Sequence, residues 1–278
     1  MLKIKTESKC VTIAGDWHGS LQQATTVLDL AYQRNCDLVL QVGDFGIWDD
    51  DKYFLDTLQE HLQTYDQTLL FIDGNHENFD LLHSYPINPA TGLRPVRPSI
   101  MHIPRGTRFT VNDVSFLAVG GAYSVDRQWR TLNKSYWRQE TVSQTDIDKA
   151  LDAPSPFTDI LLMHDSPYPA PNPITDDPAR QAIGMRQFGY RAIDQATEHR
   201  RFISPIFTHT EPHILIHGHY HEFWVGQYTH PSGIVSCVVG LDEGSAPLAQ
   251  HAITLDLEKL KSTKCRKEGK TNDNLPLS

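Results

Sequence analysis

The sequence predicts an α/β sandwich, with mixed β-sheets in the interior and helices on the outside. Short apolar runs rich in leucine and β-branched residues recur along the chain, as buried strands require. In the first part of the chain these runs alternate with helical patterns, whereas strands dominate the later half. Such alternation is typical of α/β folds, in which strands form the centre and helices cover it.

The expected strands are continuous apolar stretches, most of which end in glycine or a polar residue. In chain order they are residues 11–14, 38–42, 69–72, 114–119, 160–163, 214–216 and 235–239. A last stretch, residues 252–257, alternates apolar and polar side chains, and we expect it to form a closing edge strand.

Helices are expected where apolar residues recur three and four positions apart. Ser20 should cap the first of them, because it precedes a run in which Leu21, Ala24, Leu28 and Ala31 share one face. The predicted helices cover residues 21–34, 51–62, 143–151 and 179–200. The proline-rich stretches are predicted to be loops, and they cover residues 83–99 and 165–178.

The chain of 278 residues is long enough to bury a substantial core, and we predict one domain over residues 1–260. Its apolar fraction of 39% and charged fraction of 21% are ordinary for a globular protein. Residues 261–278 are polar and aperiodic, so we predict a disordered C-terminal tail there.

The net charge of −9 gives the protein no long-range attraction to nucleic acid or to an anionic membrane. A polyanionic substrate would therefore need a local positive centre, which a metal cluster supplies. No apolar run approaches the roughly 18 residues of a membrane span, and the N-terminal residues lack the apolar stretch of a signal peptide. We expect a cytoplasmic protein with no membrane partner, and the charge disfavours nucleic acid as a partner while leaving it open.

The four cysteines, Cys10, Cys36, Cys237 and Cys265, are scattered and show no paired spacing. Such a distribution is typical of reduced cytosolic thiols, rather than of a disulfide framework or a thiolate zinc site. We therefore expect all four thiols to be reduced.

Polar side chains follow several of the expected strands at the point where each strand ends. They occur in the segments Gly15-Asp16-Trp17-His18, Gly43-Asp44, Gly74-Asn75-His76-Glu77, Met163-His164-Asp165 and His217-Gly218-His219-Tyr220-His221. Ligand sites of α/β sheets lie beyond the carboxyl ends of strands, because the loops converge there. Glycines beside the polar residues let the backbone turn tightly and approach a ligand.

The possible metal ligands at these strand ends are two carboxylates, one amide oxygen and four imidazoles: Asp16, His18, Asp44, Asn75, His164, His219 and His221. This set suits two borderline divalent cations such as Mn²⁺, iron or Zn²⁺, and contains too many imidazoles for a Mg²⁺ site. An Asp-x-His or a Gly-Asp alone is usually a turn, and a single histidine after a strand is usually structural. The ordered conjunction of all five segments is what predicts a metal site.

The ordered set Asp16-x-His18, Gly43-Asp44, Gly74-Asn75-His76-Glu77, His164 and Gly218-His219-x-His221 resembles the calcineurin-like metallophosphoesterase superfamily. The similarity spans residues 13–221. It implies a four-layer αββα sandwich of two mixed β-sheets flanked by helices, with two metals at the strand ends. Matched motif by motif, Asp16, His18 and His221 would hold one metal, Asn75, His164 and His219 would hold the other, and Asp44 would bridge them.

The resemblance also implies a mechanism. A hydroxide between two cations, most readily Mn²⁺ but also iron or zinc, would attack phosphorus directly, without a covalent enzyme intermediate. His76 follows a metal ligand and is expected to protonate the leaving oxygen as general acid. The alternative role of His76 is to orient a metal ligand.

One branch of the superfamily, the protein Ser/Thr phosphatases, typically has Gly-Asp-x-Val-Asp-Arg-Gly and Arg-Gly-Asn-His-Glu motifs. Here the second motif is Gly43-Asp44-Phe45-Gly46-Ile47-Trp48, and Asp73 stands where the second arginine would be. These differences from the two motifs make phosphoproteins less favoured as substrates. The GDFGIW signature, followed by GGAYSVDRQWR, is similar to bacterial and phage metallophosphoesterases, many of which are phosphodiesterases.

Residues 120–140 follow a core strand and combine arginines with aromatic side chains. Arginine binds phosphate through paired hydrogen bonds, and aromatic rings stack on nucleobases. We hypothesise that Arg127 or Arg130 contacts the phosphate of the substrate. The alternative is an ordered loop held by its aromatic residues, with solvated arginines.

The resemblance and the residues together predict an enzyme, a metal-dependent phosphodiesterase or phosphatase that hydrolyses small phosphoesters, among which cyclic nucleotides are candidates. The alternatives are a nuclease or a diadenosine polyphosphate hydrolase of the same superfamily. A nuclease is disfavoured because the chain is acidic and has no basic stripe. A non-catalytic scaffold on the same fold is a further alternative, although every metal-ligand position and His76 are filled.

Overall fold

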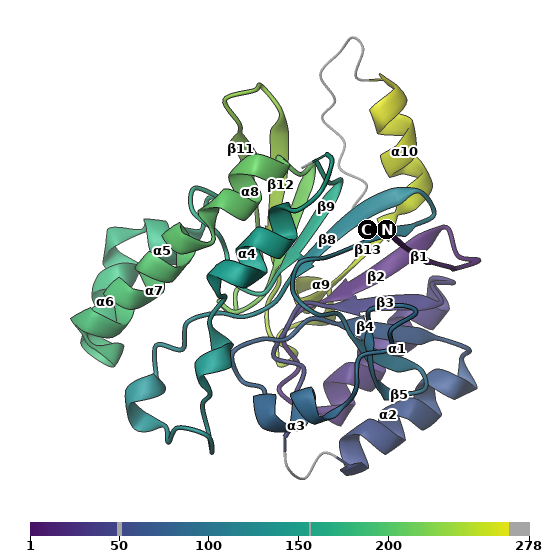
Figure 1. Cartoon of the computed structure of the whole chain (residues 1–278), viewed down its shortest axis with the longest axis horizontal. Helices are drawn as coiled ribbons and strands as arrows, with labels where there is room; N and C mark the ends of the chain where they lie inside the picture. Colours follow the sequence, from purple (N-terminus) through teal and green to yellow (C-terminus); the bar gives the residue numbers. More distant parts are fainter. Residues whose placement is uncertain (49–51, 156, 267–278) are drawn as a thin grey trace.

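The computed structural model describes residues 1–48, 52–155 and 157–266, and in it two β-sheets pack face to face between two layers of helices (Figure 1). The interior between the sheets is filled by apolar side chains of both, among them Ile13, Leu40, Phe116 and Leu162. The predicted four-layer sandwich of mixed sheets is confirmed.

The larger of the two described sheets has seven strands, and β7 and β11 run antiparallel to their neighbours β8 and β12. Its order is β1 (Leu2–Ile4), β7 (Thr107–Val111), β8 (Val114–Val119), β9 (Ile160–Met163), β10 (Ile214–His217), β12 (Val235–Gly240) and β11 (Trp224–Thr229). Its parallel centre, β8 to β12, is buried on both faces, which explains the continuous apolar runs.

The smaller described sheet has six strands, with parallel β2, β3, β4 and β6 between two antiparallel edges. Its order is β13 (Ala252–Asp256), β2 (Cys10–Ala14), β3 (Leu38–Gln41), β4 (Thr68–Phe71), β6 (Ile100–His102) and β5 (Arg94–Arg97). The predicted edge strand near residue 252 is therefore confirmed as β13.

The helices cover the two outer faces of the sandwich. Residues of α1 and α2 pack on the six-stranded sheet through Leu28 and Leu58, whereas α4 and α8 pack on the seven-stranded sheet through Ile147 and Phe207. The described helices are α1 (Leu21–Gln33), α2 (Lys52–Thr64), α3 (Phe79–Ser84), α4 (Gln144–Leu151), α5 (Pro173–Asp176), α6 (Pro178–Phe188), α7 (Tyr190–Phe202), α8 (Ser204–Thr210), α9 (Leu248–His251) and α10 (Leu257–Arg266). In the described part of the chain, no helix is long and apolar enough to cross a membrane.

Three local predictions need correction. The expected loop 83–99 contains strand β5, and the expected loop 165–178 contains helix α5. The single helix predicted over 179–200 is two helices, because Gly189 adopts a φ of +87° and turns the chain between α6 and α7. These two helices and α5 stand out from the sandwich (Figure 1).

The cysteine prediction is wrong for two residues, because Cys10 and Cys36 form a disulfide. Strand β2 and the end of α1 bring their Cα atoms to 5.5 Å, within the usual range for a disulfide. Cys237 is a free, buried thiol. A cytoplasmic location stays a prediction, and it loses the support that four reduced thiols would have given.

The predicted disordered tail begins inside a helix, because α10 continues to Arg266 and so includes residues 261–266. The remainder of that prediction, residues 267–278, lies outside the described residues.

Candidate metal centre

The structure brings all seven predicted ligands to one edge of the sandwich. Asp16 and His18 follow β2, Asp44 follows β3 and Asn75 follows β4, all in the six-stranded sheet. The other three follow parallel strands of the seven-stranded sheet: His164 after β9, and His219 and His221 after β10. The two sheets therefore face each other with their carboxyl ends aligned, and each contributes to the same cluster.

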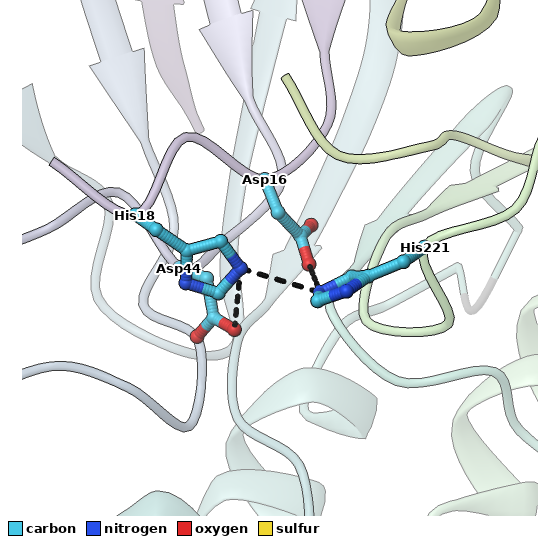
Figure 2. A group of neighbouring side chains, drawn as sticks. All are labelled: Asp16, His18, Asp44 and His221. Atoms are coloured by element: carbon cyan, nitrogen blue, oxygen red, sulfur yellow. Dashed lines mark hydrogen bonds and ion pairs between the residues drawn. The ribbon is translucent and has the colours of Figure 1, made fainter. Parts of the chain in front are cut away.

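The first half of the cluster consists of Asp16, His18, Asp44 and His221, whose ligand atoms all lie within 4.8 Å of one another. Figure 2 shows their side chains converging on one point from three separate loops. The Nε2 atom of His221 lies 3.2 Å from Asp16 Oδ2 and 3.2 Å from His18 Nε2. This half corresponds to the first predicted metal together with its bridging carboxylate.

The second half consists of Asn75, His164 and His219. His164 Nε2 lies 3.0 Å from Asn75 Oδ1 and 3.4 Å from Asp44 Oδ1, so Asp44 borders both halves. The imidazole of His219 lies 5.1 Å, centroid to centroid, from that of His164. These three residues are the ones predicted to hold the second metal, and that role stays a prediction.

Backbone strain is concentrated at these ligands. His18, Asp44, His219 and His221 all have positive φ angles, of +47°, +51°, +72° and +49°. Side chains other than glycine rarely adopt this region, and it persists where the surroundings impose it, often at functional sites. The strained backbone of these loops directs the four side chains toward the cluster.

Gly74 shows why the strand ends carry glycine. A Cβ atom at this position would collide with the carboxylate of Asp44. The chain after β4 can thus pass directly over that carboxylate, and the backbone N–H of His76 donates to Asp44 Oδ1 at 2.8 Å.

Glu77 holds the second motif in place, a role that the sequence did not indicate. Its buried carboxylate accepts hydrogen bonds from the backbone N–H groups of Phe45 (2.7 Å), Gly46 (3.1 Å) and Ile47 (2.7 Å). Burial, and after it the charge of Asp44, raises the pKa of Glu77 to about 7 despite these three donors. The acid of the Asn-His-Glu motif therefore fixes the loop that carries Asp44.

An unsatisfied carboxylate oxygen gives evidence for a cation site that does not depend on the sequence motifs. Asp44 Oδ2 is buried and has no hydrogen-bond partner among the described residues, and such an orphaned carboxylate oxygen is costly without a cation. In two of the histidines, the ring nitrogen that faces away from the cluster has a partner. His164 Nδ1 lies 2.8 Å from the carbonyl oxygen of Val42, and His221 Nδ1 lies 3.4 Å from Glu243 Oε2. Outer partners of this kind orient metal-binding histidines.

Glu243 was missed because it follows β12, a strand end at which the sequence showed no histidine. The run 235–239 is followed by Gly240-Leu241-Asp242-Glu243-Gly244, in which a glycine again precedes acidic residues, and this was the available signal.

The electrostatics of the cluster favour positive charge at its centre. Burial raises the pKa of Asp44, but the imidazoles of His164 and His76 outweigh it and hold this pKa well below its ordinary value. Burial lowers the pKa of His164, yet Asp44 and Asp16 reverse this and raise it to about 10. The carboxylates therefore attract a cation, and a metal ion would take the place of that proton.

His76 lies beside the cluster and next to an arginine. The Nη2 atom of Arg130 lies 2.7 Å from Nδ1 and 2.6 Å from Nε2 of the imidazole. Burial lowers the pKa of His76, and Arg130 lowers it further against the opposing charge of Asp44. The ring also lies 5.4 Å from that of His18, so it directly borders the first half of the cluster.

The two arginines that we hypothesised to contact phosphate are both engaged within the protein. Arg130 Nε donates to Asp126 at 2.9 Å, and Arg127 stacks on Tyr123 at 4.4 Å. Both also lie 3.5 Å from the buried carboxylate of Glu140. Their contact with substrate stays a prediction. Arg130 is the better candidate of the two, because it contacts His76 beside the metal ligands.

Glu140 also reaches a predicted ligand through a hydroxyl group. Ser124 Oγ donates to Glu140 at 2.6 Å and accepts from Asn75 Nδ2 at 3.0 Å. This chain fixes the amide of Asn75 with its oxygen toward His164. The segment 120–140 thus fixes the orientation of a predicted metal ligand through hydrogen bonds.

Comparison with known proteins gives a consistent family. A family model described as calcineurin-like phosphoesterase matches residues 11–223. No curated protein matches the sequence.

Solved structures resemble the fold at low sequence identity. One crystal structure is 12% identical with a TM-score of 0.53, and the match covers 90% of this chain and 96% of that one. TT1561 of Thermus thermophilus is 15% identical with a TM-score of 0.49, over 90% and 95% of the two chains. A dimetal phosphatase from Danio rerio is 14% identical with a TM-score of 0.49, over 89% and 92%. The first of these supports the fold alone.

Proposed function

Since the chain belongs to the calcineurin-like phosphoesterase family, and is thus a metal-dependent phosphoester hydrolase, we propose that it hydrolyses small phosphodiesters at a two-metal centre. The observation that carries the proposal is the convergence of Asp16, His18, Asp44 and His221 within 4.8 Å, where one carboxylate oxygen of Asp44 has no hydrogen-bond partner among the described residues. The runner-up is a phosphatase acting on small monoesters at the same centre.

Members of the family typically bind a dinuclear metal centre, and the cluster of Asp16, His18, Asp44 and His221 is in keeping with one. We propose Mn²⁺ as the native metal, with iron or zinc as alternatives, because imidazoles outnumber carboxylates among the donors. When bound, two such cations neutralise the phosphate oxygens and activate water for in-line attack.

The residues of the chain then divide the work. Asp16, His18 and His221 would hold one cation, Asn75, His164 and His219 would hold the other, and Asp44 would be shared by both. The carboxylate oxygens of Asp44 lie 3.9 Å from His18 Nε2 and 3.4 Å from His164 Nε2. His76 is proposed to protonate the leaving oxygen. Its lowered pKa makes its protonated form a stronger acid, and Arg130 beside it would stabilise negative charge.

The test compares bis(p-nitrophenyl) phosphate with p-nitrophenyl phosphate, in the presence of Mn²⁺, for the purified full chain. We expect faster hydrolysis of the diester and loss of activity after treatment with a chelator. Faster hydrolysis of the monoester would favour the phosphatase instead. Two bound cations without turnover of either ester would contradict the proposal and favour the non-catalytic scaffold.

A nuclease of this family would cut plasmid DNA in Mn²⁺, whereas the enzyme proposed here should leave it intact. The acidic net charge of −9 supports this expectation.

A further inference from the structure

A cavity of about 370 Å³ lies directly beside the metal centre. Asp44, Asn75 and His221 form part of its floor, and His76 lines it as well. Helices α5, α6 and α7, together with residues 125–126, form its walls. A phosphoryl group on the metals would therefore have its substituent inside this cavity. The volume is at the small end of the range for ligand pockets.

The walls expose mostly apolar surface and are incompletely buried. Ile174, Phe188, Ile193 and Ala196 line the cavity, and each of them is half-buried. No side chain of the described helix α6 is buried, whereas α1 buries Ala24, Val27, Leu28 and Ala31 against the sheet. The helices α6 and α7 therefore turn apolar side chains toward an open space rather than toward a core. A ligand that fills this space would remove them from water.

The charged side chains of the wall are already paired in the part of the chain that the structure describes. Arg180 pairs with Glu222, and Asp126 with Arg130. The buried guanidinium of Arg200 donates to the carbonyl oxygens of Ser166 and Ala170 at 2.7 and 3.1 Å, and Asp165 accepts from His199 at 2.7 Å. Among these described residues, the wall thus offers no spare cation for a second phosphate.

We propose that this cavity binds an uncharged, flat apolar group attached to the scissile phosphate, such as an aryl group or a nucleobase, and that Ile193 and Phe188 select for it. The inference rests on the proposed phosphodiesterase function and names the substrate class. It also disfavours a diadenosine polyphosphate, whose further phosphates would meet the apolar wall. Phe188 extends the wall outward, since its ring lies 5.8 Å from that of Trp129.

The experiment compares benzyl p-nitrophenyl phosphate with methyl p-nitrophenyl phosphate, which share a leaving group. In Mn²⁺ the wild type should prefer the benzyl ester by about tenfold or more in kcat/KM. Ile193→Ala should raise KM for the benzyl ester about tenfold and leave kinetics with the methyl ester within about twofold. Phe188→Ala provides a second variant with the same expected pattern.

The matched control is Ile183→Ala on α6, because Ile183 is 57% exposed and does not line the cavity. It should behave as wild type with both esters. Equal turnover of the two esters by the wild type, or an identical loss in the control, would overturn the inference while leaving the phosphodiesterase proposal intact.

A binding measurement separates the inference from catalysis. Benzyl(methyl)phosphinate and dimethylphosphinate contain no ester bond, so calorimetry with the Mn²⁺-loaded protein reports binding alone. Tighter binding of the benzyl compound, weakened about tenfold by Ile193→Ala, supports the inference even if neither diester is hydrolysed. That combination would contradict only the proposed function. Equal binding of the two phosphinates would contradict the inference.

Discussion

The metal centre and the helical wall above it differ in how completely their side chains are satisfied. At the metal centre, Asp16, Asp44 and His164 are buried, and short contacts fix most of their polar atoms. In the wall, Ile193 and Phe188 are half-buried beside a cavity. In our proposal, the buried strand ends carry the reaction chemistry, and a peripheral pair of helices carries the choice of substrate.

The largest effect is expected for a substitution of Asp44 in the metal centre. Asp44→Asn should lower turnover on the order of 10⁴-fold, because it removes the charge shared by both halves of the cluster and a metal centre supplies several kcal/mol of stabilisation. Metal content and kcat would be measured together. Asp194→Asn, a matched change at an exposed position on α7, should retain both. Full activity of the Asp44→Asn variant would show that Asp44 is not a metal ligand.

Two phenylalanines, one in each region, should differ in their contribution to stability. Phe45 is fully buried and stacks on Phe71 at 4.1 Å, so Phe45→Ala should lower the free energy of unfolding by about 3–5 kcal/mol. Phe188→Ala should cost about 1 kcal/mol, because the side chain is only half-buried. Denaturant unfolding of both variants tests the pair. Equal losses would show that the wall is as much a part of the core as the metal framework.

His76 lies at the boundary between the two regions. His76→Ala should slow turnover by at least about 10²-fold when the leaving alcohol is a poor leaving group, with bound metal unchanged. The loss should be much smaller with p-nitrophenyl esters, because p-nitrophenolate leaves without a proton. If metal is lost, or if both types of ester slow equally, His76 orients a ligand rather than donating a proton.

The smallest expected effect on activity lies at the junction of α6 and α7. Gly189 has a φ of +87° that alanine resists, so Gly189→Ala should destabilise the protein by about 1–2 kcal/mol and weaken its preference for benzyl esters. Gly92 also has a positive φ, of +73°, and Gly92→Ala is the control because it lies in a different loop. It should show the stability loss without the change in preference. A change of preference in both variants would contradict a local effect.

The sequence predicted the metal framework because its signals are local. Each ligand follows a buried strand, often beside a glycine, and the carboxyl ends of neighbouring parallel strands must meet at one edge. The positions of Asp16, Asn75 and His164 follow from that rule.

The remaining features depend on tertiary contacts with no local sequence signal. Cys10 and Cys36 look unrelated until β2 and the end of α1 are packed together. Arg130 reaches His76 only through the conformation of the loop 120–140. Ile193 is an apolar residue within the predicted helix 179–200, and only the fold shows that it lines a cavity.

Strand β13 has a consequence for how the protein is made. It completes the six-stranded sheet by pairing with β2, where Thr12 and Thr254 lie 3.3 Å apart through their hydroxyl oxygens across a separation of 242 residues. At about 5–20 residues per second, the ribosome needs roughly 10–50 s to deliver β13 after β2 has emerged. Throughout that interval β2 lacks this antiparallel neighbour, and the loops bearing His219 and His221 are also late to arrive. We expect β2 to require protection by chaperones during that interval, and the full set of ligands to be available to metal only after His221 has emerged.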